Sequence, residues 1–142
     1  MRVIVAGGGR VGMQLASLLA ASSYEVAVIE VDVERVEVLQ ASRDESDAAA
    51  APEIIAGNAC VAEVLEAAGA LRAKALLACT ADDAENLVVA VLAKRHLEVP
   101  LVLARCNEEA NRWLFDASWG VDGTVSEASA LAGLLEAVQR ES

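Results

Sequence analysis

The sequence predicts an α/β fold, a doubly wound six-stranded parallel sheet with helices on both faces. Three observations lead to this prediction. Short apolar runs rich in Val, Ile and Leu alternate with longer amphipathic stretches, a glycine cluster directly follows the first run, and aromatic residues are only 3% of the chain. Alternating strand and helix patterns imply parallel strands joined by helical crossovers. Hydrophobic residues make up 56% of the 142 residues, enough for one aliphatic core.

The first half of the chain starts with a strand at 2–6 (RVIVA), because β-branched residues favour strands and the run ends at glycine. A helix is expected at 11–21, where apolar residues recur at helical spacing. A second strand follows at 25–30 (EVAVIE) and a second helix at 32–40, with its charges outward. The polar, acidic segment 42–52 is interpreted as a flexible surface loop or the frayed end of a helix.

The second half repeats the alternation and completes six strands. Gly69 is placed to end the third helix, Asp82 or Asp83 to cap the fourth, and Pro100 to begin the fifth strand, where proline is tolerated. A leucine face on the last helix either packs on its own sheet or pairs with a second chain. We expect one domain over 1–142, with strands at 53–56, 74–80, 101–105 and 123–125 and helices at 60–68, 82–95, 108–117 and 126–140.

Charge and cysteine content narrow the classes of partner. The chain has 11 basic and 22 acidic residues, a net charge of −11, which argues against nucleic acid and against an anionic membrane surface as partners. No apolar run is long enough for a membrane span, and the N-terminus does not resemble a signal peptide. Cys60, Cys79 and Cys106 are widely spaced, so neither a disulfide framework nor a metal site is predicted. A reducing cytoplasm is the expected compartment.

The glycine cluster carries the clearest functional signal. Gly7, Gly9 and Gly12 form a GxGxxG pattern between a predicted strand and a predicted helix, the context in which this pattern binds nucleotides. Gly7 permits the tight turn, Gly9 lets the backbone approach a pyrophosphate, and Gly12 lets helix and strand pack closely. Free N–H groups at the helix start then face the anion. The alternative is a glycine-rich turn with no ligand.

An acid at the end of the second strand points to the kind of nucleotide. Glu30 lies 18 residues after Gly12, where a carboxylate accepts hydrogen bonds from ribose hydroxyls. A carboxylate repels a 2′-phosphate, so NAD, NADH or an adenine nucleotide (ATP, ADP or AMP) is favoured over NADP. The alternative is a solvated charge at a strand end. Asp32 is interpreted as a helix-start residue.

Nothing in the sequence indicates catalysis. No nucleophile motif occurs, His96 fits a surface or capping role, and the cysteines fit structural roles, although a helix start near Cys60 would lower its pKa. We therefore predict no catalytic residues and no enzyme activity. Two alternatives stay open: the cofactor domain of an NAD-dependent oxidoreductase, and a lobe that only mediates assembly.

Six segments in order resemble one family, the TrkA-N, KTN or RCK N-terminal lobe of potassium-transport regulators. The segments are VIVAGGGRVGMQLASLL, VAVIEVDVERV, IIAGNACVAEVLEAAG, LLACTADDAENLVVAVLAK, VLARCNEEAN and WGVDGTVSEAS, and the match runs from about residue 1 to 135. Asn58 of this chain stands where the family usually has an aspartate near the adenine. Glu30 stands where the family usually has another aspartate, which binds the ribose. The resemblance implies that Asn86 fixes the loop before its helix. It also matches Glu127 to an acid that, in some members, lies by the dimer interface and binds a cation.

The resemblance extends the candidate site and implies a function. The expected nucleotide-binding residues are Gly7, Gly9, Arg10, Val11, Gly12, Glu30, Asn58, Ala59, Thr80, Ala81 and Arg105. The chain would be a regulatory sensor domain of a potassium transport system that binds NAD(H) or an adenine nucleotide and gates a membrane channel, transporter or antiporter. Expected partners are a second copy, as a homodimer or higher homo-oligomer, and a membrane subunit in trans or on the same longer chain. The expected location is cytoplasmic, at the inner face of the membrane.

Overall fold

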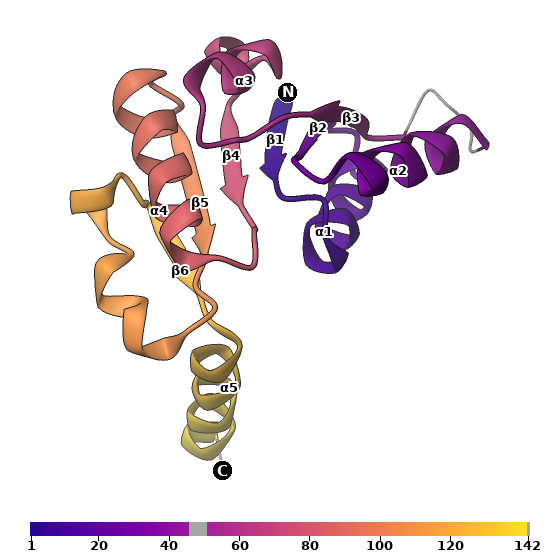
Figure 1. The fold of residues 1–142 in the computed structure, drawn as a ribbon. Coiled ribbons are helices and arrows are strands. Elements are labelled where there is room, and N and C mark those ends of the chain that lie inside the picture. Colours follow the sequence, from indigo (N-terminus) through magenta and orange to yellow (C-terminus); the bar gives the residue numbers. More distant parts are fainter. Residues whose placement is uncertain (46–50, 142) are drawn as a thin grey trace.

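The six predicted strands form one parallel sheet. The computed structural model describes residues 1–45 and 51–141, and its strands lie in the order β3-β2-β1-β4-β5-β6 (Figure 1). The strands are β1 (Arg2–Ala6), β2 (Glu25–Glu30), β3 (Glu53–Ala56), β4 (Ala75–Ala78), β5 (Leu101–Arg105) and β6 (Gly123–Val125). From β1 the chain adds β2 and β3 on one side of the sheet, and it then adds β4, β5 and β6 on the other side, so the order of strands reverses between β1 and β4 while all strands stay parallel. The carboxyl ends of these two strands therefore meet at a topological switch point, where such sheets bind ligands.

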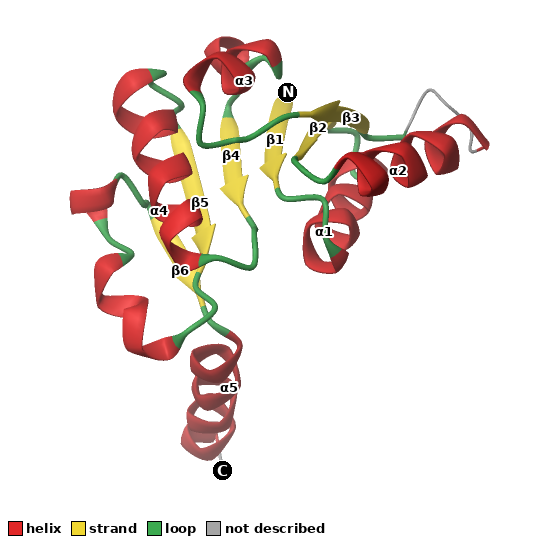
Figure 2. Ribbon diagram, viewed as in Figure 1, coloured by secondary structure: helices red, strands yellow, loops and turns green. Residues whose placement is uncertain are grey.

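Helices lie on both faces of this sheet, as predicted (Figure 2). They are α1 (Arg10–Ala21), α2 (Val33–Glu45), α3 (Ala62–Ala67), α4 (Asp83–Val91) and α5 (Glu127–Glu141), with short helical turns at Ala70–Arg72, Leu92–His96, Glu109–Leu114 and Ala117–Trp119. Strand residues alternate between two apolar cores. Val5 and Val28 pack with residues of α1 and α2, whereas Ile4 and Ile29 pack with residues of α3 and α4.

Three predicted helices differ from the structure in type or by more than two residues at an end, whereas the other elements agree within two residues at each end. The helix expected at 32–40 continues as α2 to Glu45, so the first residues of the predicted loop 42–52 are helical, and residues 46–50 lie outside the described part of the chain. The helix expected at 108–117 is two tight 3₁₀ turns. They are separated because Asp116 accepts a hydrogen bond from the Ser118 N–H, which starts a new turn. The helix expected at 82–95 passes into a π-helical turn after Val91.

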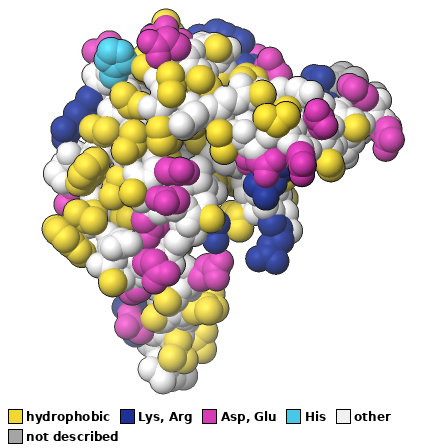
Figure 3. All heavy atoms as spheres, in the orientation of Figure 1, with side chains coloured by type: hydrophobic (Ala, Val, Ile, Leu, Met, Phe, Trp, Pro, Cys, Tyr) yellow, Lys and Arg dark blue, Asp and Glu magenta, His cyan; other side chains and the backbone are white. Residues whose placement is uncertain are grey.

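The last helix does not cover its own sheet. Figure 1 shows α5 extending away from the strands, and its leucine face, Leu131, Leu134, Leu135 and Val138, is 61–68% exposed. Hydrophobic side chains are visible at the surface along this helix in Figure 3. The sheet face beside α1 holds an apolar groove of about 550 Å³ between Leu15, Leu77 and Leu103. Of the two roles considered for this leucine face, packing on its own sheet is therefore wrong.

Candidate nucleotide-binding site

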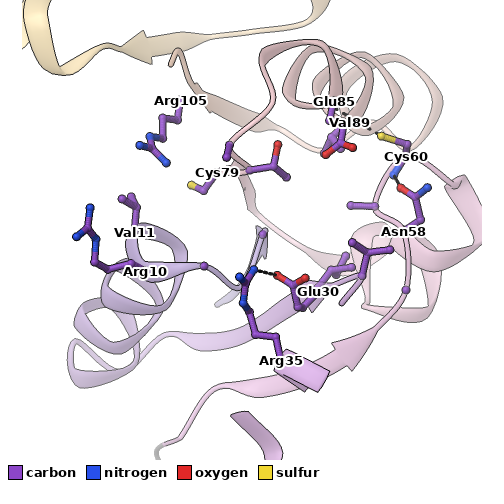
Figure 4. A pocket seen from close by; sticks show the side chains of 18 residues that line it. Arg10, Val11, Glu30, Arg35, Asn58, Cys60, Cys79, Glu85, Val89 and Arg105 are labelled. Carbon is purple, nitrogen blue, oxygen red and sulfur yellow. Dashed lines mark hydrogen bonds and ion pairs between the residues drawn. The ribbon is translucent and has the colours of Figure 1, made fainter. Parts of the chain in front are cut away.

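A cleft of about 380 Å³ lies at the switch point, and it contains ten of the eleven predicted site residues (Figure 4). They come from the glycine loop, the ends of β2, β4 and β5, and the loop after β3. Gly12 is the exception, because it lies beneath the loop in α1. The volume falls within the range of small-molecule sites in proteins. Five segments that are far apart in sequence therefore meet in one cavity.

Two glycines of the loop are required by the fold itself. Gly7 has a φ of +114°, and a Cβ there would lie 3.0 Å from the backbone of Cys79 and Thr80. A Cβ on Gly12 would lie only 1.9 Å from the Gly7 carbonyl oxygen. Neither position accommodates a side chain, because the end of β4 lies against Gly7 and α1 packs directly against the loop at Gly12. This agrees with the roles that the spacing predicts for them.

Gly9 is different, because the fold does not require a glycine there. Its φ of −76° and ψ of −169° suit any residue, and a Cβ would meet nothing closer than Arg35 Nη1 at 4.0 Å. Gly9 is also the N-cap of α1, which has no side-chain cap and no acidic residue in its first turn. The uncapped N–H groups and the positive end of the helix dipole face the cleft and favour an anion. The lack of a side chain at Gly9 leaves room for that anion to reach the backbone.

Glu30 joins the end of β2 to the glycine loop. It is only 5% exposed, and its Oε1 accepts a hydrogen bond of 2.9 Å from the Gly8 N–H. Its Oε2 accepts one of 2.8 Å from the Asp32 N–H, and Arg35 Nη1 lies 3.3 Å from Oε1. A carboxylate has about four acceptor positions, so one is left for a ribose hydroxyl. The alternative of a solvated charge at the strand end is therefore excluded by burial.

The loop after β3 brings Asn58 and Ala59 to the cleft. Gly57 has a φ of +156°, and a Cβ there would lie 2.8 Å from Val64 Cγ1, so this turn needs glycine. Asn58 Oδ1 accepts a 2.9 Å hydrogen bond from the Cys60 N–H. An aspartate carboxylate would accept the same bond, so this turn does not distinguish Asn58 from the acid expected from the resemblance. The amide nitrogen adds a donor that an aspartate lacks.

The ends of β4 and β5 are held together by Asn86. This side chain is fully buried, and its Oδ1 accepts hydrogen bonds from the Thr80 N–H and the Thr80 hydroxyl. Its Nδ2 donates to the Thr80 and Arg105 carbonyl oxygens at 3.0 and 2.9 Å. Two predicted site residues are thus positioned by one amide, in agreement with the role that the resemblance implies for Asn86.

Asp83 has a positioning role that the sequence analysis missed. Asp82 is the cap of α4, since it accepts a hydrogen bond from the Glu85 N–H. Asp83 instead binds the loop after β5 through the N–H groups of Asn107 and Glu108 and the side chains of Asn107 and Asn111. Burial raises the pKa of Asp83, but these hydrogen bonds outweigh it and hold the pKa below its usual value. The consecutive acids at 82 and 83 were the available signal, because a helix start needs only one cap.

The cleft is more positive than the rest of the chain. Arg10, Arg35 and Arg105 line it together with only two acids, Glu30 and Glu85, in a chain whose net charge is −11. Arg35 was not among the predicted site residues. It lies five residues after Glu30 on the first turn of α2, and this position was the signal that would have identified it. An excess of positive charge in the cleft favours an anionic ligand.

The thiols in the cleft are not activated. Burial, followed by the nearby charges of Glu85 and Asp82, raises the pKa of Cys60. Burial raises the pKa of Cys79 to about 11, against a smaller opposing effect of Arg105. The lowered pKa considered for Cys60 from its sequence position is therefore wrong, because the acidic side chains and burial outweigh the helix start. Among the described residues, no group of three or more side chains is arranged to hold a metal ion.

The doubly wound sheet with a glycine loop at its switch point defines the class of protein, a Rossmann-type domain. The chain belongs to the TrkA-N domain family, whose model matches residues 3–127. It is 38% identical over 138 residues to the Trk system potassium uptake protein TrkA of Mycobacterium tuberculosis. That match covers 96% of this chain and 58% of the relative, so the chain spans little more than half of that protein's length. Along the described residues, no helix combines the length and hydrophobicity of a bilayer crossing.

Solved structures agree with the fold. The TrkA-N domain of the Escherichia coli inner membrane protein ybaL superposes with a TM-score of 0.78 at 22% identity, covering 96% of this chain and 95% of that one. The GsuK channel bound to NAD has a TM-score of 0.72 at 26% identity, covering 95% of this chain and 22% of the channel. GsuK bound to ADP matches with the same score and identity over 32% of its length.

Proposed function

We propose that this chain is a nucleotide-sensing regulatory domain of a potassium transport system. The observation that carries this proposal is Gly9, a loop glycine that the fold does not need but an approaching phosphate does. The positive cleft and the buried acid at the end of β2 support it. So do the potassium uptake relative at 38% identity and the GsuK structures named for NAD and ADP.

Each predicted residue has a task in binding an adenine nucleotide. The N–H groups at the start of α1 bind the phosphates, with Arg10 and Arg105 on either side of the cleft. Glu30 accepts a ribose hydroxyl through its remaining acceptor position. Asn58 and Ala59 contact the base, while Thr80 and Ala81 line the opposite wall. The ligand is NAD, NADH, ATP, ADP or AMP.

Arg105 couples nucleotide binding in the cleft to the position of α5. Arg105 lines the cleft and also lies 3.7 Å from Glu127 in the first turn of α5. A phosphate that binds Arg105 competes with Glu127 for the guanidinium, and this changes how α5 is held. Binding shifts the population of two arrangements only if its affinity for them differs. The change in α5 then alters the angle between paired domains and gates a membrane subunit.

We further propose that the paired domain is a second copy of this chain. The exposed leucine face of α5 and the apolar groove beside α1 are complementary in chemistry. Within one chain, α5 lines this groove only through Glu127 and Ala130, and the leucine face lies outside it. A second copy covers both. The membrane partner is a potassium channel or transporter subunit, in trans or on the same longer chain, which places this domain at the cytoplasmic face.

Hydride-transfer chemistry is less well supported. The acids and thiols that line the cleft are Glu30, Glu85, Cys60 and Cys79. Glu30 is already hydrogen-bonded on both oxygens, and both thiols have raised pKa values. A binding domain without enzyme activity therefore accounts better for these residues.

A thermal-shift panel with NAD, NADH, ATP, ADP, AMP and NADP tests the function. A ligand at 100 times its Kd stabilises the folded state by about 2.7 kcal/mol, which raises Tm by roughly 5–15 °C in a domain of this size. We expect such a shift with at least one adenine nucleotide and no consumption of NADH with carbonyl substrates. No shift with any nucleotide would favour a lobe that only mediates assembly, and turnover of NADH would favour the oxidoreductase.

A further inference from the structure

We propose that Arg35 is a nucleotide-binding residue that holds a phosphate ester on the adenosine ribose. This inference rests on the proposed function. Arg35 lines the cleft from the first turn of α2. Its Nη1 lies 3.3 Å from Glu30 Oε1 and 4.0 Å from the position of a Cβ on Gly9. The guanidinium therefore lies between the carboxylate expected to bind the ribose and the glycine expected to bind the phosphates, as Figure 4 shows for Arg35 and Glu30.

The present partner of Arg35 is easily exchanged. The Arg35 side chain is 49% exposed, and its contact with Glu30 is a single long hydrogen bond from one of the five guanidinium donors. Solvent around the half-exposed guanidinium screens its attraction to the buried Glu30 carboxylate, so this single contact contributes little to stability. Glu30 does not depend on it, because the Gly8 and Asp32 N–H groups hold both of its oxygens. Arg35 can thus direct its other donors to a ligand while both Glu30 oxygens stay hydrogen-bonded.

A phosphate ester is a stronger partner than the one Arg35 has. The planar guanidinium donates two parallel hydrogen bonds to phosphate oxygens, and these charge-assisted bonds are stronger than a single long contact. The nearby N-terminus of α1 attracts the same anion. A phosphate on the ribose is therefore bound from two sides, by backbone N–H groups and by Arg35.

The pairing also changes the expected selectivity of the site. The sequence disfavours NADP because an isolated carboxylate repels a 2′-phosphate. In the structure Glu30 is not isolated, since Arg35 balances its charge. A phosphate at the ribose 5′ position, present in all the candidate nucleotides, and one at the 2′ position, present in NADP, offer Arg35 the same chemistry. The two positions are distinguished by comparing ligands that differ in one phosphate.

The test compares wild type with Arg35→Gln and Arg35→Lys by ligand-observed NMR titration of adenosine, AMP, NAD and NADP. The control is Arg112→Gln, because Arg112 is also 49% exposed, forms a comparable ion pair with Glu109 and does not line the cleft. If Arg35 binds the 5′-phosphate, we expect Arg35→Gln to weaken AMP binding at least tenfold and to leave adenosine binding unchanged. If Arg35 binds the 2′-phosphate, we expect Arg35→Gln to weaken NADP binding at least tenfold more than NAD binding. Arg35→Lys should recover part of the loss.

Three results would overturn the inference. If the ratio of the Kd values of AMP and adenosine, and that of NADP and NAD, were the same in Arg35→Gln as in wild type, Arg35 would contact no phosphate. An equal loss for all four ligands would show that Arg35 only positions Glu30. If wild type bound none of the four, the proposed function itself would fail, and the inference with it. The first two results leave wild-type binding intact and so separate the two failures.

Discussion

The Gly8 N–H donates a 2.9 Å hydrogen bond to Glu30 Oε1, and this bond joins the loop expected to bind phosphates to the acid expected to bind the ribose. A Cβ added at Gly8 would lie 3.1 Å from the Glu30 Cβ, so a side chain at Gly8 would crowd Glu30. The two halves of the candidate site are therefore built as one unit. We therefore expect a change at Glu30 to affect both the loop and nucleotide binding.

Glu30→Gln should show this double role. The Gln oxygen still accepts from Gly8, but its NH₂ group then faces the Asp32 N–H, which leaves a donor unsatisfied. We expect a loss of about 1–3 kcal/mol in the free energy of unfolding and weaker NAD or ATP binding. Urea denaturation and calorimetric titration measure the two effects. Glu30→Asp serves as the control, since aspartate is usual here in the family and should retain binding. Full affinity in Glu30→Gln would place the ribose elsewhere.

Asp83→Asn should destabilise the loop after β5. Asn offers one acceptor oxygen where four donors converge, so we expect a loss of about 1–3 kcal/mol. The pKa of Asp83 is lowered in the folded state, so its contribution is complete above the unfolded value near 4 and is lost as pH falls through the folded value. The difference in Tm between wild type and Asp83→Asn should therefore shrink below about pH 4.

The control for Asp83 is Asp44→Asn, an exposed acid at the end of α2. This variant should match wild type in Tm at neutral pH. If Asp83→Asn behaved like Asp44→Asn at pH 7, the network around Asp83 would not contribute to stability.

Cys79 should react slowly with alkylating reagents. A pKa of about 11 leaves about one molecule in a thousand as thiolate at pH 8, and the side chain is buried. We expect iodoacetamide to label Cys79 of the folded protein far more slowly than a free thiol, and at the normal rate in urea. Mass spectrometry of labelled peptides measures both rates. Rapid labelling in the folded state would mean that this wall of the cleft opens.

Charge on the leucine face of α5 should prevent pairing of two chains. Leu131→Glu combined with Leu135→Glu places two carboxylates in the apolar face, where burial in an interface is costly. We expect dimeric wild type and a monomeric variant by analytical ultracentrifugation. Leu71→Glu is the matched control, because Leu71 is 72% exposed on a different surface and should leave the dimer intact. Equal masses for wild type and the α5 variant would exclude this face as the interface.

The order of elements was predictable because each depends on local pattern. The run at 2–6, the Gly69 cap and the glycine loop follow from propensity and spacing alone, and the structure agrees with them. The position of α5 was not predictable, because a leucine face looks the same whether it covers its own sheet or another chain. The 3₁₀ turns at Glu109–Leu114 and Ala117–Trp119 depend on Asp116 and on packing against α4, which periodicity does not record.

The residues of the candidate site also fall into those that the sequence predicted and those that it did not. Residues fixed by a motif, such as Gly7 and Glu30, were found from the sequence and lie in the cleft. Arg35 and Asp83 were missed because their roles arise from contacts across the fold, with Glu30 and with the loop after β5. Such contacts appear only once the chain is folded.

The proposal that the glycine loop binds the phosphates of a nucleotide is tested by a calorimetric titration of Gly9→Val with the nucleotide that wild type binds. The backbone at Gly9 suits valine, and no atom lies closer than 4.0 Å to the new Cβ, so the variant should fold, with Tm lowered only because valine is a poorer N-cap than glycine. The valine side chain fills the space above the N-terminus of α1, so we predict that no binding is measurable. Gly133→Ala, a glycine on α5 with nothing within 4 Å of its Cβ position, should bind normally. A folded Gly9→Val protein that binds the nucleotide with wild-type affinity would show that no phosphate approaches the backbone at Gly9.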